Sequence, residues 1–237
     1  MHIAIMQPYF LPYLGYFQLI ATVDRFVIYD NVEYTKKGWI NRNRILRNGE
    51  PVLFTLPLGK GSDYLDVRDR TIASSFDPTK LLGQFAGAYR NAPHFDAIMP
   101  YLSEILQYSD RNLFAFVRHS LEVTCRYLGI ATPLLVSSEI EKSSHLHGSD
   151  RVISICEQLG ADRYTNPIGG LLLYRPSDFA ARGITLRFLR SRPDPYLQGG
   201  ATFQPYLSIV DVMMFNSRDQ ISMMLTNGYD IVEGSDV

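Results

Sequence analysis

The sequence predicts an α/β protein in which a mostly parallel β-sheet lies between layers of helices, giving three layers in all. Short apolar runs of strand length alternate with helical stretches in both the opening and the closing parts of the chain. The 237 residues, 46% of them hydrophobic and 20% charged, are also sufficient to bury a substantial core. We expect a single α/β domain over residues 1–237, with a helical insertion around residues 78–127.

The chain opens with a strand, a loop, a helix and a second strand. Residues 3–6 form an apolar run that stops at Gln7 and Pro8, because proline cannot donate to a β-ladder. Apolar side chains then recur at helical spacing over residues 16–23, and residues 25–29 predict the second strand. Such a unit closes right-handed with its strands parallel. Gln7 and Asp30 are therefore predicted at the same carboxyl edge of the sheet, where open α/β folds bind ligands.

The middle of the chain changes from strands to helices. Residues 51–58 predict a third strand, and the alternating pattern of residues 65–72 predicts an exposed edge strand. Between them, residues 59–62 read Gly-Lys-Gly-Ser without the spacing of a P-loop, so a plain turn and a ligand loop both stay open. Residues 78–127 predict three amphipathic helices with breaks at Pro93 and Asp110.

The second half returns to alternating strands and helices. Strands are predicted at residues 133–137, 163–165 and 185–189, with helices near residues 149–159 and 176–181. Strands separated by helices favour parallel pairing. We expect the strand order to reverse beside the first strand.

Bulk properties narrow the function classes. A formal net charge of −1 argues against general nucleic-acid binding, which needs a cationic surface. Cys125 and Cys156 lie in apolar helical patterns that are typical of buried, unreactive thiols. The N-terminus lacks the pattern of a secretory signal, and no segment approaches the ~20 apolar residues of a membrane span. The expectation is a cytoplasmic protein without a membrane span.

Polar and aromatic side chains gather after the first two predicted strands. The candidate catalytic residues are Gln7, Tyr16, Asp30 and Arg42. The candidate substrate-binding residues there are Tyr9, Tyr13, Tyr34, Trp39 and Asn41. The alternative is that these aromatic side chains only cover the sheet edge while the charges are solvated. We favour a site, because the only tryptophan lies here among amide, carboxylate and guanidinium groups.

Later loops add further candidates at predicted strand ends. Ser149 and Arg151 stand at a predicted helix start, where backbone amides and a guanidinium suit an anion. Asn166, Tyr174 and Gln198 follow later strands as further substrate-binding candidates. His145 and His147 have no carboxylate or cysteine at matching spacing, so no metal site is expected. A mobile surface loop is the alternative for residues 137–151.

The motifs carry a resemblance to a known family. The N-terminal pattern is Gln7-Pro8-Tyr9-Phe10, Pro12, Gly15-Tyr16-Phe17, Asp30-Asn31-Val32, Tyr34, Lys37-Gly38-Trp39 and Asn41-Arg42. The C-terminal pattern is Tyr196, Gln198, Phe203-Gln204-Pro205, Leu207-Ser208 and Asp211. Together they resemble the WbqC-like family over essentially the whole chain. The resemblance implies a bacterial cytoplasmic protein of surface-polysaccharide (O-antigen, lipopolysaccharide) biosynthesis, with a suggested role as a glycine transferase.

A second resemblance concerns the turn after the first strand. Tyr13-Leu14-Gly15-Tyr16 is similar to the His-x-Gly-His signature of nucleotidyltransferases, which implies a nucleotidyltransferase-like, Rossmann-like fold. Both histidines are tyrosines here, and a phenol brings no positive charge to a phosphate. Adenylyl transfer by the usual route is thereby in doubt, and convergence of the turn is an equal alternative.

The candidate residues bind and polarise, which suits amide formation from an activated carboxyl group and an amine. The favoured hypothesis is a transferase that moves a glycyl or aminoacyl group to the amino group of a nucleotide-linked sugar. Asp30 would hold or deprotonate the amine, and Arg42 and Arg151 would bind phosphate. A nucleotidyltransferase-like enzyme and a non-catalytic sugar-nucleotide binding module are the alternatives. The partner is a small molecule, either a sugar nucleotide or an activated amino acid. The sequence names no cofactor and no oligomeric state.

Overall fold

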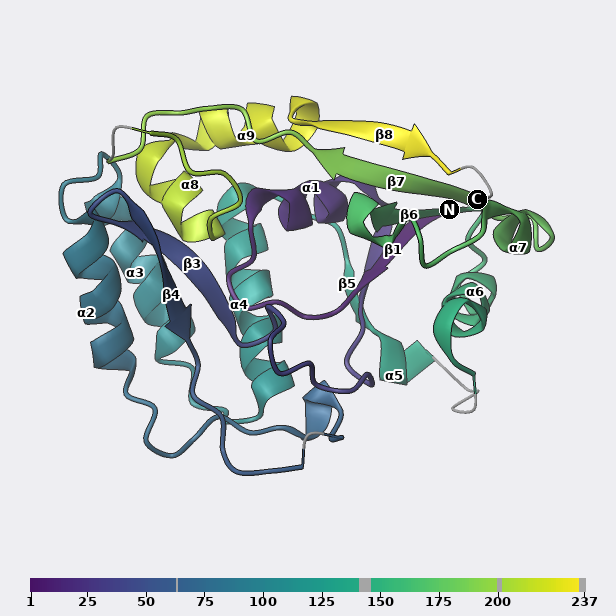
Figure 1. Ribbon diagram of the computed structural model, residues 1–237, viewed down its shortest axis with the longest axis horizontal. Helices are drawn as coiled ribbons and strands as arrows, with labels where there is room; N and C mark the ends of the chain where they lie inside the picture. Colours follow the sequence, from purple (N-terminus) through teal and green to yellow (C-terminus); the bar gives the residue numbers. More distant parts are fainter. Residues whose placement is uncertain (63, 141–145, 200–201, 235–237) are drawn as a thin grey trace.

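The computed structural model describes residues 1–62, 64–140, 146–199 and 202–234. Its centre is a six-stranded sheet in the order β5-β2-β1-β6-β7-β8 (Figure 1). The strands are β1 (His2–Met6), β2 (Arg25–Ile28), β5 (Leu134–Val136), β6 (Arg163–Pro167), β7 (Thr185–Ser191) and β8 (Tyr229–Glu233). All neighbouring pairs are parallel except β7 and β8. The predicted α/β class with a mostly parallel, Rossmann-like sheet is confirmed.

Helices cover both faces of the sheet because its strands are apolar on both faces. In β1, Ile3 and Ile5 pack into one cluster and Ala4 into the other, as the two-residue period of a strand requires. Figure 1 shows the two helical layers on either side of the sheet. One layer contains α6 (Gly148–Gln158) and α7 (Pro176–Ala180). The other contains α1 (Leu14–Thr22), α8 (Ile209–Phe215) and α9 (Arg218–Asn227).

The three helices predicted over residues 78–127 are present and join the second layer. It consists of α2 (Pro78–Tyr89), α3 (Phe95–Leu106) and α4 (Leu113–Leu128). Asp77 and Asn112 cap α2 and α4 by accepting backbone N–H donors, and Gly129 ends α4 in the left-handed region at φ 72°. Core residues of these helices belong to the same cluster as Ala4 of the sheet. We infer from this shared core that the chain is a single folding unit.

The segment after β2 differs from the prediction. The predicted third strand is β4 (Glu50–Thr55), but it pairs antiparallel with β3 (Arg42–Arg47) in a separate two-stranded sheet. Asn48 and Gly49 connect the two strands with φ values of 53° and 81°, which is the Asn-Gly turn that favours tight hairpins. This hairpin turns Arg42, expected in a loop, into a strand residue.

Residues 65–72 do not form the predicted edge strand. They contain the single 3₁₀ turn η1 (Val67–Asp69) and isolated bridges. Arg70 donates to the carbonyl of Ser62 at 2.7 Å, and its guanidinium lies 4.9 Å from the centre of the Tyr34 ring. The buried residues of this folded loop are Val67, Arg70 and Ile72, which do not follow the two-residue period of a pleated strand.

The strand order reverses between β1 and β6, as predicted. The chain crosses from β1 through α1 to β2 and β5 on one side, and returns through α5 (Ser137–Ile140) and α6 to β6 on the other. The crossovers diverge at this point, which leaves a crevice at the carboxyl ends of β1 and β6. The 3₁₀ turn η2 (Ile168–Gly170) follows β6 directly and forms part of the crevice wall.

Candidate functional site

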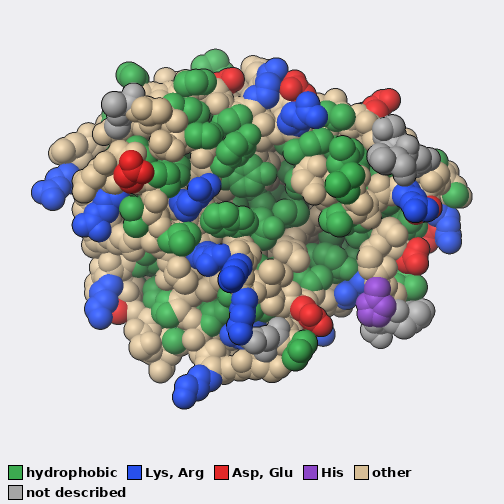
Figure 2. Space-filling model, in the orientation of Figure 1, with side chains coloured by type: hydrophobic (Ala, Val, Ile, Leu, Met, Phe, Trp, Pro, Cys, Tyr) green, Lys and Arg blue, Asp and Glu red, His purple; other side chains and the backbone are tan. Residues whose placement is uncertain are grey.

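A groove crosses the molecule at the carboxyl edge of the parallel strands. Figure 2 shows this face hollowed near its middle, with apolar side chains on the floor and Lys and Arg side chains along one side. The groove has three adjoining parts, which we name the switch-point, charged and aromatic compartments. Tyr9 lines both the aromatic and the switch-point compartments. Tyr29, Val32 and Tyr174 line both the switch-point and the charged compartments.

The switch-point compartment lies where the strand order reverses and has a volume of about 390 Å³. Gln7 enters it from the end of β1, and Asn166 from the end of β6. Tyr9 and Tyr174 complete it with two phenols. Four residues that the sequence predicts as site residues, from segments about 160 positions apart, thus line one compartment. Amide and phenol groups at this position suit a polar, uncharged part of a substrate.

Asn166 is held against a glycine. A Cβ atom added at Gly170 would lie 1.8 Å from Nδ2 of Asn166, a distance that no real structure tolerates. Asn166 Oδ1 also accepts from the hydroxyl of Tyr164 at 3.2 Å. Gly170 therefore makes room for the Asn166 amide.

The Gly170→Ala variant is expected to weaken ligand binding in the switch-point compartment by about tenfold, because the new methyl group must displace the Asn166 amide. Titration of the variant with a nucleotide-linked amino sugar measures this. Gly169→Ala is the matched control, since nothing lies within 4 Å of its added Cβ. Equal affinity losses in both variants would contradict the role given to Asn166.

The charged compartment continues the groove towards α6 and has a volume of about 510 Å³. Arg151 lines it, donates from Nη1 to the carbonyl of Asn31 at 3.0 Å, and stacks 5.0 Å above the Tyr29 ring. Gly148, the first residue of α6, lines it as well, whereas Ser149 is half-buried beside it. A fixed guanidinium next to a helix start suits a phosphate or carboxylate. The remaining charged lining residues are Glu33, Asp66, Arg68 and His147.

The aromatic compartment lies at the other end of the groove and has a volume of about 190 Å³. Tyr9, Tyr13, Trp39 and Tyr206 contribute four rings, and Arg44 contributes a guanidinium 5.4 Å from the centre of the Trp39 ring. Asn43 also lines it, but its side chain is engaged with the Leu11 carbonyl and the Arg44 N–H. The compartment therefore presents flat apolar faces and one positive charge.

The phenols of the groove are neutral hydrogen-bond donors. Burial raises the pKa of Tyr9 and of Tyr174 above the usual value for a phenol. Burial and the neighbouring Tyr9 and Tyr206 raise the pKa of Tyr13 to about 12. A phenol with a raised pKa stays protonated at neutral pH, so these groups can hold an oxyanion but do not act as bases.

Asp30 lies at the predicted edge of the sheet but does not line any of the three compartments. It is 2% exposed. Its Oδ1 accepts from Ser137 Oγ at 2.8 Å and from Ser138 N at 3.0 Å, and its Oδ2 accepts from Ser138 Oγ at 2.7 Å. The carboxylate thus joins the end of β2 to the start of α5. Its neighbours Tyr29 and Asn31 form the groove wall.

Other predicted site residues are engaged away from the compartments. Tyr16 is 2% exposed in the core and donates to the Gln7 carbonyl at 2.8 Å. Tyr34 donates to Asn41 Oδ1 at 2.8 Å, and Asn41 donates to the Leu56 carbonyl at 2.8 Å. Arg42 donates to the carbonyls of Gly38 and Lys37 and thereby holds the loop that carries Trp39. These residues shape the groove from behind.

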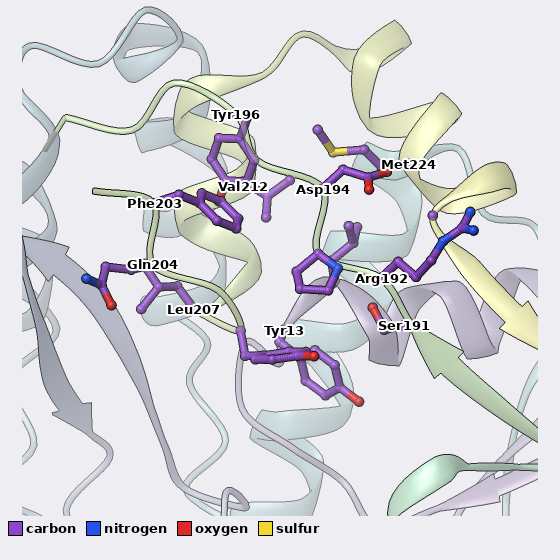
Figure 3. A pocket seen from close by; sticks show the side chains of 14 residues that line it. Tyr13, Ser191, Arg192, Asp194, Tyr196, Phe203, Gln204, Leu207, Val212 and Met224 are labelled. Atoms are coloured by element: carbon purple, nitrogen blue, oxygen red, sulfur yellow. The ribbon is translucent and has the colours of Figure 1, made fainter. Parts of the chain in front are cut away.

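Gln198 belongs to a buried network in the C-terminal segment. Asp211 is fully buried and accepts from Tyr89 at 2.8 Å, Tyr196 at 2.7 Å and Gln198 Nε2 at 2.8 Å. Figure 3 shows a cavity beside this segment, with Tyr13 at one end and Tyr196 at the other. Its volume of about 30 Å³ suits roughly two water molecules, so it is too small for a substrate.

Arg44 and Tyr206 line the groove but were not predicted as site residues. Arg42 and Arg44 are two positions apart on one strand and so share a face. Recognising the Asn48-Gly49 hairpin in the sequence would have found Arg44 beside Trp39. Tyr206 has φ 58°, a left-handed conformation that its sequence context does not signal.

No group of three potential metal-ligating side chains occurs within residues 1–62, 64–140, 146–199 and 202–234. His145, weighed as a ligand with His147, lies outside the described residues. Over the same described part of the chain, no helix combines the length and apolarity needed to cross a membrane.

Comparison with known proteins identifies the family. A model of the WbqC-like protein family matches residues 7–223, which is most of the chain and includes both sequence motifs. The chain belongs to the WbqC-like protein family. This WbqC-like protein is also 32% identical over 219 residues to the uncharacterized protein Rv1507c of Mycobacterium tuberculosis, covering 90% of the present chain and 93% of the relative. No solved structure matches it.

Proposed function

We propose that this WbqC-like protein is a transferase of O-antigen biosynthesis that moves a glycyl group to the amino group of a nucleotide-linked amino sugar. The observation that carries the proposal is the switch-point compartment, where Gln7 and Asn166 meet two phenols beside Arg151. Amides and phenols suit the hydroxyl and amino groups of a sugar, and Arg151 suits its diphosphate. The glycyl donor is an ester or anhydride of glycine.

In the proposed reaction, the lone pair of the sugar nitrogen attacks the carbonyl carbon of the donor. A C–N bond forms, and the C–O bond to the leaving group breaks with both electrons going to that oxygen. The amine proton passes to solvent or to Glu33, a carboxylate of the charged compartment. The protonated Tyr9 and Tyr174 donate to the oxygen that becomes negative during attack. Most of the rate enhancement would come from orientation of the two substrates.

The proposal is tested by binding and by product formation. A nucleotide-linked amino sugar is expected to raise the melting temperature more than its N-acetylated form, which offers no nucleophilic amine and has greater bulk at that nitrogen. Incubation with an activated glycine should then yield the amide, which mass spectrometry detects. If binding is seen without product from any glycine donor, the protein is a sugar-nucleotide binding module instead.

Arg151→Gln is expected to weaken sugar-nucleotide binding about tenfold or more, because one charge-assisted contact to phosphate is lost. Isothermal titration calorimetry measures the change. Arg182→Gln is the matched control: it removes the same charge from an exposed arginine that pairs with Glu157 of α6. Equal affinity in the Arg151 variant and the wild type would show that the diphosphate does not bind in the charged compartment.

A further inference from the structure

We propose that the aromatic compartment, lined by Tyr9, Tyr13, Trp39, Arg44 and Tyr206, is a binding site for a nucleoside monophosphate. The nucleobase would lie between the rings and the phosphate would bind Arg44. The inference rests on the proposed function in one respect only. A glycyl donor that is the anhydride of glycine and a nucleoside monophosphate contains this group.

The size of the compartment and its aromatic rings favour a ligand with a single planar ring system. Its volume of about 190 Å³ is below the roughly 300 Å³ at which sites for drug-sized ligands begin, so it admits one ring system. Trp39 is 37% exposed and Tyr206 50% exposed, unusually open positions for large aromatic side chains. Tyr206 meets Tyr13 edge to face at 6.0 Å. Nucleobases stack on aromatic faces of this kind with little dependence on sequence.

Tyr206, which carries one of these rings, has an unfavourable backbone conformation. Tyr206 has φ 58°, in the left-handed region that non-glycine residues rarely adopt. Its half-exposed ring gains little from burial in return. Strained backbone at an exposed aromatic residue is typical of ligand-contacting positions.

The guanidinium of Arg44 favours a negatively charged ligand. Its Nε is buried without a hydrogen-bond partner among the residues that the structure describes, and its guanidinium stacks on Trp39. Arg42, beside the same ring at 6.0 Å, is by contrast bound to two backbone carbonyls. A cation held over an aromatic ring repels cationic ligands and favours an anion. A nucleoside monophosphate supplies both a planar ring and an anion.

The compartment is joined to the rest of the groove by Tyr9, whose ring also lines the switch-point compartment. A nucleotide bound on Trp39 would therefore direct its phosphate substituent along the groove. That substituent would be the glycyl group of the donor, because the proposed function places the diphosphate of the sugar nucleotide at Arg151, in the charged compartment.

Trp39 provides a direct test because it is the only tryptophan of the chain. AMP and UMP are expected to quench its fluorescence saturably, and adenosine and uridine to bind at least tenfold more weakly. Arg44→Gln should reduce the affinity for AMP to that for adenosine while leaving adenosine binding within twofold. Arg47→Gln, an exposed arginine on the same strand, is the control and should change neither affinity. Calorimetry with Trp39→Ala should show a tenfold or greater loss for both ligands.

Three results would overturn the proposal: equal affinities for AMP and adenosine in the wild type, AMP binding that leaves Trp39 fluorescence unchanged, or equal effects of the Arg44 and Arg47 substitutions. Competition then identifies the source of the nucleotide. A sugar nucleotide that displaces AMP competitively assigns the site to the sugar nucleotide, whereas simultaneous binding assigns it to the glycyl donor. These titrations need no turnover, so absence of amide formation would reject the proposed function and leave this site intact.

Discussion

Asp30→Asn is expected to lower the free energy of unfolding by about 2 kcal/mol while leaving the rate of the proposed glycyl transfer within a few fold of the wild type. Asp30 accepts three hydrogen bonds from Ser137 and Ser138 with almost no solvent contact. Asparagine keeps the shape but places an amide donor against these donors. Urea unfolding and the rate of glycyl transfer, measured on one preparation, give both quantities.

The opposite pattern would support the catalytic role predicted for Asp30. As a general base, its loss would reduce turnover by roughly two to four orders of magnitude with little change in stability. Ser138→Ala provides an independent comparison, because it removes one donor to the same carboxylate without changing charge. A stability loss in both variants with turnover preserved would establish Asp30 as the link between β2 and α5.

Asp211→Asn is expected to have the larger effect on stability, a loss of about 3 kcal/mol in the free energy of unfolding. Asp211 is fully buried, and three side chains from α2 and the C-terminal segment donate to it. An amide in its place faces the Tyr196 and Gln198 donors with a donor of its own. Chemical denaturation monitored by circular dichroism measures the loss.

The pH dependence of the stability difference between wild type and Asp211→Asn provides a second test of the role of Asp211. Burial raises the pKa of Asp211 above its usual 3.8, although its hydrogen-bond donors oppose the shift. A carboxyl with a raised folded-state pKa contributes most stability below pH 3.8 and loses it as the pH rises through the folded-state value. The stability difference between wild type and Asp211→Asn should therefore shrink as the pH rises over this window. Tyr196→Phe, which removes one donor only, should cost less than Asp211→Asn at every pH.

Local sequence patterns predicted the parts of the fold that depend on local periodicity. The strand ends at Gln7 and Asp30, the three insertion helices and the reversal of strand order are all present. Strand β3, its antiparallel pairing with the predicted strand β4, and the final strand β8 were missed. Four of the six residues of β3 are polar, and its pairing with β4 is what makes it a strand.

The sequence by itself determined which residues reach the carboxyl edge of the sheet, because strand period and right-handed crossover are set by local chemistry. Gln7, Tyr9, Asn166 and Tyr174 meet in one compartment at this edge. Only the tertiary structure decided which polar groups at that edge face the groove. Asp30 finds its partners 107 residues away in Ser137, and Arg44 finds none among the described residues for its Nε. Hydrogen-bond partners come from distant segments of the chain, so packing rather than residue type separates the structural carboxylate of Asp30 from the guanidinium of Arg44, which lines the aromatic compartment.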